Sequence, residues 1–271
     1  LAFYLWFFYR STKGDQVRWL PDSKDAWVRI VLIAVFAVMG YQLLFMHGMK
    51  FTAAGDASLI ITMNPIFTVL LASPFLGQRI TGRMVYGLIL AFIGVAVVTG
   101  WSPNTDIPLH DRLKGDFMIM LAALCWATAT NLTRIMLETE GDYGASSSEI
   151  VVWYSLVGTV LLTPWWLADV YSGGFETPNN EDLVAILYLS ILSTVLAYIW
   201  FVIGVEKIGA TSASSYVFLV PPFGVLGGWL LLDERLGASL LLGFTLIVVG
   251  VRVVQRESEA VGRAGRSPLQ D

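Results

Sequence analysis

Leu183–Val205 reads LVAILYLSILSTVLAYIWFVIGV, an unbroken run without a charged side chain. At about 1.5 Å per residue, a helix of this length crosses a hydrocarbon layer roughly 30 Å thick. Lipid offers the backbone no hydrogen bonds, so a crossing segment must be a helix or part of a closed barrel. The run does not alternate between polar and apolar residues as a barrel strand does. It therefore predicts a transmembrane helix.

Seven more apolar runs of similar length lie along the chain. They are Ile30–Met49, Ala57–Leu76, Met84–Gly100, Phe117–Thr133, Ile150–Ala168, Ala213–Leu232 and Ala238–Val254. Of 17 basic and 21 acidic residues, only Arg252 lies inside any of the eight runs. A soluble protein would need eight helices without a polar face, which is not expected of surface helices. The pattern predicts an all-α membrane protein with eight full transmembrane helices.

The composition excludes several classes of function. Hydrophobic residues make up 56% and charged residues 14% of the 271 residues, whereas soluble domains average about 45–50% and about 25%. The net charge of −4 gives no attraction to nucleic acid. A single cysteine, Cys125, allows no disulfide framework. Without a P-loop or an H-E-x-x-H motif, we expect no enzyme activity, no cofactor and no metal site.

The basic residues predict an orientation. If the residues before the run at 30–49 are cytoplasmic, thirteen of the Lys and Arg residues fall in inside segments and four in outside loops. This bias satisfies the positive-inside rule through all eight runs. We expect a multi-pass protein of the plasma (inner) membrane with a cytoplasmic C-terminus. The lipid bilayer and a small-molecule substrate are its expected partners, and a homodimer is possible.

The sequence matches itself at one constant offset, which we call the repeat offset. The aligned pairs include Gly48 with Gly204, Ala57 with Ala213, Pro65 with Pro221, Arg79 with Arg235, Gly87 with Gly243 and Gly94 with Gly250. Five crossings separate the matched runs, so the two copies are expected to have opposite orientations in the membrane. Inverted repeats of this kind build many secondary transporters, with the substrate site where the halves meet.

The repeat also predicts where the copies begin and end. We expect a first repeat at 1–100, a second at 115–254 and a cytoplasmic polar tail at 255–271. Counting back by the repeat offset places the start of the first copy well before Leu1. The expected fold is a ten-helix, five-plus-five inverted-repeat transporter. This chain would be N-terminally truncated, with eight full helices and a fragment of another.

These features resemble the drug/metabolite transporter superfamily, specifically its EamA-like family. The first copy has the Asn64-Pro65 step, Phe67, the turn LGQRIT at Leu76–Thr81, and the glycines Gly87 and Gly94. The second copy has Pro221, Phe223, the turn LDERL at 232–236, Gly243 and Gly250. One departure is Gln78, where the family turn carries the glutamate that the second copy keeps as Glu234. The resemblance implies transport activity without fixing the substrate.

Several polar and aromatic residues inside the runs are candidates for a substrate cavity. They are Thr62, Asn64, Pro65, Trp126, Asn131, Tyr154, Ser190, Thr194, Tyr198, Tyr216 and Pro221. Pro65 and Pro221 are expected in mid-helix, where proline frees a carbonyl. Ser190, Thr194 and Tyr198 form a stripe that should face a cavity or a partner helix, and Thr62 and Asn131 could instead bond between helices. The aromatic residues could line a pocket or pack in the core.

The function most favoured is secondary transport of a small neutral or zwitterionic metabolite, amino-acid-like, by alternating access and in the direction of export. No Lys or Arg lies in the middle of any run, which disfavours phosphorylated substrates. The alternatives are a multidrug or lipophilic-cation exporter, suggested by 13% aromatic residues and eight methionines, and a non-transporting membrane scaffold.

Overall fold

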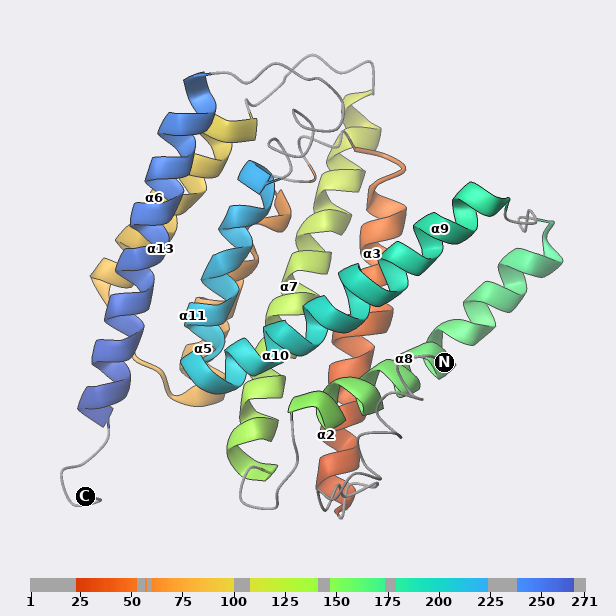
Figure 1. Ribbon diagram of the computed structural model, residues 1–271, viewed down its shortest axis with the longest axis horizontal. Coiled ribbons are helices and arrows are strands. Elements are labelled where there is room, and N and C mark those ends of the chain that lie inside the picture. The colour runs from red at the N-terminus through yellow and green to blue at the C-terminus, as the bar shows by residue number, and fades with distance from the viewer. Residues whose placement is uncertain are drawn as a thin grey trace.

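The computed structural model describes residues 23–52, 57, 60–99, 108–140, 147–173, 179–223 and 238–265. Within them every regular element is a helix (Figure 1), which confirms the all-α class. The α-helices are α2 (Lys24–Ala34), α3 (Tyr41–Gly48), α5 (Asn64–Leu76), α6 (Gly82–Thr99), α7 (Leu109–Glu140), α8 (Ser147–Tyr171), α9 (Asn180–Tyr188), α10 (Ala197–Ile208), α11 (Ala210–Ser215) and α13 (Ala238–Gly265). Two π-helical segments, η1 (Val35–Gly40) and η3 (Leu189–Leu196), and one 3₁₀ turn, η4 (Tyr216–Leu219), complete the set.

In the part of the chain that the structure describes, four continuous helices are long and apolar enough to cross a membrane. They are Lys24–Gly48, Leu109–Glu138, Glu149–Tyr171 and Asn180–Ile208, and each contains all or most of one predicted run. Two shorter apolar helices, Asn64–Leu76 and Gly82–Val97, cover parts of two more runs. The total number of crossings stays a prediction.

Side chains fix where two of the long helices begin. Ser23 precedes α2, and its hydroxyl accepts the N–H of Ala26 at 3.0 Å. Asn179 precedes α9 and accepts the N–H of Asp182, whose carboxylate accepts the N–H of Asn179, each at 2.9 Å. Both caps satisfy backbone donors that the first helical turn leaves unpaired. They set the points at which the chain leaves a polar loop for an apolar run.

The run at 57–76 is broken rather than continuous. The backbone turns at 60–63, where the Met63 N–H donates to the Ile60 carbonyl at 2.9 Å, and α5 begins at Asn64. Pro65 lies in the first turn of α5, where its missing N–H removes no intrahelical bond. The expectation of a mid-helix proline is wrong here because the break precedes the proline. Two prolines that do lie further inside described helices are Pro74 in α5 and Pro164 in α8.

The same irregularities recur at the repeat offset. The 3₁₀ turn η4 occupies 216–219, which corresponds to the turn at 60–63. Pro221 follows η4 as Pro65 follows the earlier turn, so it too lies just after a break, and it is buried. The π-helical η1 corresponds to residues 191–196, all within η3. Equivalent positions of the aligned sequences therefore share equivalent departures from the α-helix.

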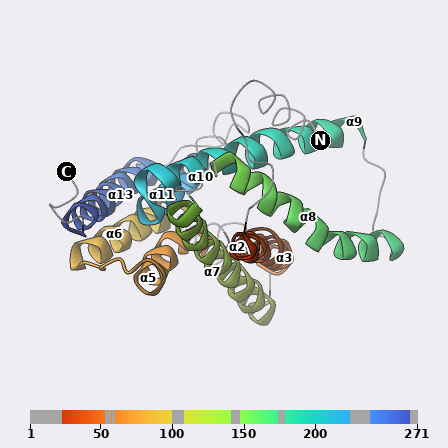
Figure 2. The ribbon, with the colours of Figure 1, turned by 90° about the horizontal axis from the view of Figure 1, so that it is seen from below.

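Glycines bring α6 and α13 into close contact. Gly87 on α6 lies against the carbonyl of Gly250, and Gly94 lies against the carbonyl of Gly243. Because the repeat offset aligns Gly87 with Gly243 and Gly94 with Gly250, each glycine meets the counterpart of the other. A two-fold axis relating two copies produces this reciprocal pairing. The two helices lie side by side in both views (Figures 1 and 2).

Two groups of buried apolar side chains hold the helices together. One lies among α2, α7, α8 and α10, and the other among α5, α6, η4 and α13. The contact of α5 with α7, and of α11 with both α7 and α13, joins the two groups. The C-terminal end of α8 and α9 extend to one side of the other helices (Figure 1), and α9 has no buried residue.

Candidate functional site

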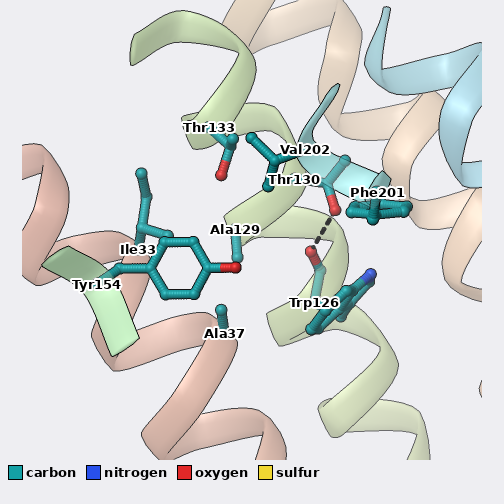
Figure 3. Close-up of a pocket in the computed structure, with 9 residues that line it drawn as sticks. All are labelled: Ile33, Ala37, Trp126, Ala129, Thr130, Thr133, Tyr154, Phe201 and Val202. Atoms are coloured by element: carbon teal, nitrogen blue, oxygen red, sulfur yellow. Dashed lines mark hydrogen bonds between the residues drawn. The ribbon is translucent and has the colours of Figure 1, made fainter. Parts of the chain in front are cut away.

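A pocket opens inside the first buried group (Figure 3). It is lined by Ile33, Ala37, Trp126, Ala129, Thr130, Thr133, Tyr154, Phe201 and Val202, from α2, η1, α7, α8 and α10. None of these nine residues carries a charge. In this conformation the enclosed space has room for little more than a water molecule, so a solute enters only when the surrounding helices move apart. The pocket's apolar and aromatic surface with a few hydroxyls is typical of small-molecule sites.

Trp126 forms the aromatic wall of the pocket. Its ring centroid lies 5.2 Å from that of Tyr41, 5.2 Å from that of Tyr198 and 5.5 Å from that of Phe201. Tilted pairs at this separation attract through the edges and faces of the rings. Two of the partners stand next to π-helical segments, since Tyr41 directly follows η1 and Tyr198 is the second residue after η3. Such segments redirect side chains and are frequent at functional sites.

The two copies meet beside this wall. The side chains of Gln42 and Tyr198, which the repeat offset aligns with each other, lie close enough to interact. This contact joins α3, which continues from η1, to α10, which continues from η3. Two neutral polar side chains therefore meet between the equivalent helices of the two sequence halves, next to the pocket.

A separate polar cluster joins α5 to α7. The Asn131 amide donates to the Thr68 carbonyl at 3.1 Å and to the Ala127 carbonyl at 3.0 Å. The Thr68 hydroxyl bonds the carbonyl of Asn64 at 3.0 Å and its Oδ1 at 3.1 Å. Thr62, in the break before α5, is fully buried as well. Of the residues predicted for the cavity, Asn64 and Asn131 thus belong to this interhelical contact, and neither they nor Thr62 line the pocket.

Five other predicted residues lie away from the pocket. Ser190 and Thr194 are exposed on η3, and their hydroxyls donate to the Leu187 and Leu189 carbonyls of their own helix, at 3.2 and 2.8 Å. Tyr216 on η4 is about half exposed, and Pro221 is buried beyond η4. Pro65 is buried in the first turn of α5, on the opposite side of α7 from α8 (Figure 2). The structure thus brings Trp126, Tyr154 and Tyr198 together and leaves the others outside.

Sequence reasoning missed seven of the nine lining residues. Trp126, Ala129, Thr130 and Thr133 lie at spacings of three and four, which puts them on one face of α7. This spacing could have identified these lining residues from the sequence, because it places two hydroxyl groups on the same helix face as the aromatic Trp126. No sequence signal distinguished the other apolar lining residues, because apolar residues fill every run. These residues are Ile33, Ala37, Phe201 and Val202.

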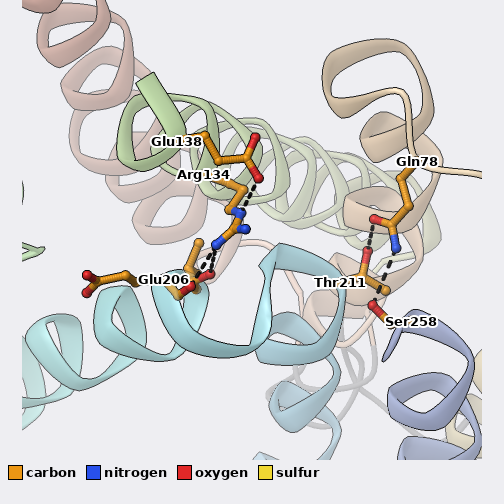
Figure 4. A network of polar contacts seen from close by, with 7 residues as sticks. Gln78, Arg134, Glu138, Glu206, Thr211 and Ser258 are labelled. Atoms are coloured by element: carbon orange, nitrogen blue, oxygen red, sulfur yellow. Dashed lines mark hydrogen bonds and ion pairs between the residues drawn. The ribbon is translucent and has the colours of Figure 1, made fainter. Parts of the chain in front are cut away.

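Polar contacts join α7 to the end of α10, close in sequence to the pocket residues Thr133 and Val202 (Figure 4). The Arg134 guanidinium donates to the carbonyls of Val205 at 3.0 Å and Glu206 at 2.7 Å, and to the Glu138 carboxylate at 2.7 Å. A positive charge near the last carbonyls of a helix also interacts favourably with the negative end of the helix dipole. The hydroxyl of Ser147 at the start of α8 donates to the Glu206 carboxylate. Three helices are therefore tied together at this end.

Gln78 forms a second set of hydrogen bonds between helices, drawn in the same view as those of Arg134 (Figure 4). It accepts from the Thr211 hydroxyl at 2.8 Å and donates to the Ser258 hydroxyl at 3.4 Å, linking the α5–α6 turn to α11 and α13. The neutral amide uses both its acceptor and its donor here, which explains a glutamine at this position. Its counterpart Glu234, together with Arg235, lies outside the described residues.

Comparisons with known proteins agree with one another. The model of the EamA-like transporter family matches residues 1–100 and 113–256. A "Probable terminal-alkyne amino-acid exporter" of Streptantibioticus cattleyicolor is 27% identical over 92% of this chain and 79% of its own. A "Probable amino-acid metabolite efflux pump" of Escherichia coli is 26% identical over 74% of this chain and 67% of its own. A crystal structure covering 87% of this chain and 79% of its own has a TM-score of 0.71 at 18% identity, so the fold is shared.

Proposed function

Because the chain belongs to the EamA-like transporter family, we propose that it carries a small neutral or zwitterionic metabolite by alternating access through the pocket beside Trp126. Membership makes it a multi-pass membrane transporter rather than an enzyme. The observation that carries the proposed substrate class is the pocket lining, which is aromatic and hydroxylic without a single charge. A phosphorylated substrate would need cations that this lining lacks.

An amino acid fits this lining best. The face of an aromatic ring attracts an ammonium group, and hydroxyls can bond a carboxylate, so both charges of a zwitterion find partners. Two relatives carry names that refer to amino-acid export or efflux. Their names support amino-acid export as the proposed activity of this chain.

The proposed architecture is two inverted copies, 1–100 and 115–254, followed by a cytoplasmic tail at 255–271. The matched turns, π-helical segments and glycine contacts support the two copies. Ten helices in the complete protein, residence in the plasma membrane and assembly as a homodimer belong to the same proposal. The positive-inside bias puts the Arg134 contacts on the cytoplasmic side. In this proposal, these contacts close the pocket towards the cytoplasm.

A second candidate function is export of lipophilic cations. The ring cluster of Trp126, Tyr41, Tyr198 and Phe201 favours it, because several aromatic faces can hold a delocalised cation. Purified protein in liposomes separates the candidates. Saturable, stereoselective flux of an L-amino acid that lipophilic cations do not inhibit supports the first, and inhibition by a broad cation panel supports the second. Folded protein without saturable flux of either solute would leave only the scaffold alternative.

The substitution Trp126→Phe is expected to raise the half-saturating solute concentration a few-fold, because the smaller ring loses contact area and face. Trp200→Phe is the matched control, since Trp200 lies on α10 close to Phe201 in sequence but is 69% exposed away from the pocket lining. The measurement is the concentration dependence of flux in liposomes. Equal shifts for both variants would contradict the placement of the site at Trp126.

A further inference from the structure

Two hydroxyl groups in the pocket have no hydrogen-bond partner among the described residues. Tyr154 is 3% exposed and Thr133 is 4% exposed, and both hydroxyls point into the space between α2, α7 and α8 (Figure 3). Their oxygen atoms remain open to that space. Most polar groups inside proteins are bonded, so the occupant of the pocket, water or solute, has to supply the partner. An unbonded pair that faces one pocket is therefore available to a bound molecule.

Two other threonines of α7 differ from Thr133, because their hydroxyls do have hydrogen-bond partners. Thr128 and Thr130 each donate to the carbonyl four residues earlier, at 2.9 Å to Leu124 and 2.9 Å to Trp126. This is the usual way in which a helical threonine satisfies its hydroxyl. Thr133 has the same option and does not take it. Its hydroxyl turns into the pocket, so its proton remains available to a ligand.

We infer that the hydroxyls of Tyr154 and Thr133 bind the carboxylate of a zwitterionic amino acid, an assignment that deepens and depends on the proposed transport function. Two O–H donors on one side of a pocket match the two oxygens of a carboxylate, and bonds to an ionised acceptor are the stronger kind. The pocket lining has no basic residue, so the solute brings its own positive charge. The ammonium group then lies against the aromatic wall formed by Trp126.

The apolar part of the lining limits the side chain of the amino acid. Ile33, Ala37 and Val202 contribute only aliphatic surface, and they lie close together around a narrow space. A short branched aliphatic side chain matches this aliphatic surface and adds no polar group that would need a partner. L-valine is therefore the probe, and 2-methylpropylamine, which is valine without its carboxylate, is its matched partner.

The test measures equilibrium binding of both radiolabelled probes to the full chain in detergent. Tyr154→Phe and Thr133→Val are each expected to weaken L-valine binding about three- to tenfold, as expected for loss of one hydrogen bond, with little change for 2-methylpropylamine. Thr130→Val removes a hydroxyl that is already bonded to the Trp126 carbonyl and should change neither. Equal losses for both probes, or an equal loss in Thr130→Val, would overturn the inference.

Thermal unfolding separates this inference from the proposed substrate. Failure of the wild-type protein to bind either probe would remove the amino-acid assignment, and melting of the empty protein then decides about the hydroxyls. Unbonded hydroxyls contribute no internal contact, so Tyr154→Phe and Thr133→Val should melt at or above the wild-type temperature. A lower melting temperature in either variant would mean that its hydroxyl already has a partner inside the protein and would overturn the inference.

Discussion

Gly250→Ala should lower the melting temperature of the protein, although alanine is the better helix former. A Cβ atom at position 250 would lie 2.5 Å from the Gly87 carbonyl oxygen and 2.6 Å from the Ala91 backbone nitrogen. Backbone atoms cannot turn aside as a flexible side chain can, so α6 and α13 would have to move apart. Overpacking of this kind costs about 1–3 kcal/mol, which exceeds the gain of about 1 kcal/mol in helix propensity.

Gly204→Ala is the matched control for this prediction. It too is a glycine inside a helix, but a Cβ there would meet only the Ala213 methyl at an ordinary 3.8 Å. Alanine still has the higher helix propensity there and makes no clash, so the melting temperature should stay the same or rise. Gly94→Ala should behave like Gly250→Ala, because its Cβ would lie 2.7 Å from the Gly243 carbonyl. Unchanged melting of both α6–α13 variants would show that the two helices are not in such close contact.

The hydrophobic runs predicted the helical class because the backbone of a membrane-spanning segment must satisfy its own hydrogen bonds. For an uncharged run of this length, a helix does so. The repeat offset also predicted where equivalent structure would occur, and the turns at 60–63 and 216–219 follow it. The exact form of the irregularity was not predictable from Pro65. Proline is compatible with both a kink inside a helix and the first turn of a new one, and only tertiary packing selects between them.

The candidate site was harder to predict than the fold. A helical run shows which residues share a face, but not which face meets another helix, so Tyr198 and Ser190 looked alike in sequence. In the structure Tyr198 packs on Trp126 and Ser190 is exposed. The π-helical η3, which contains Ser190 and ends two residues before Tyr198, adds to the difference because it alters the rotation per residue on which the expected stripe depends. Tyr154 could be identified as a candidate, whereas its missing hydrogen-bond partner could not.

Arg134→Ala should open the pocket from the side on which α7 meets the end of α10. Arg134 holds two backbone carbonyls of α10, and its side chain is only 24% exposed, so water replaces these bonds incompletely. Hydrogen bonds from a charged group contribute about 1.5–3 kcal/mol, which corresponds to roughly ten- to a hundredfold in the population of an open state. Arg134→Lys should open the pocket to an intermediate degree, since an ammonium group cannot reach both carbonyls and Glu138 with the geometry of a guanidinium.

Cysteine accessibility measures this opening directly. In a Cys125→Ser background, Val202→Cys places one thiol in the pocket lining, and a membrane-impermeant maleimide is applied to each side of sealed vesicles. Arg134→Ala should increase the labelling rate from the proposed cytoplasmic side at least tenfold. Arg83→Ala is the control, because Arg83 is 82% exposed and its ion pair with Glu257 lies at the surface, where such pairs contribute little. Labelling that is unchanged in Arg134→Ala, or accelerated equally in both variants, would mean that the Arg134 contacts do not close this end of the pocket.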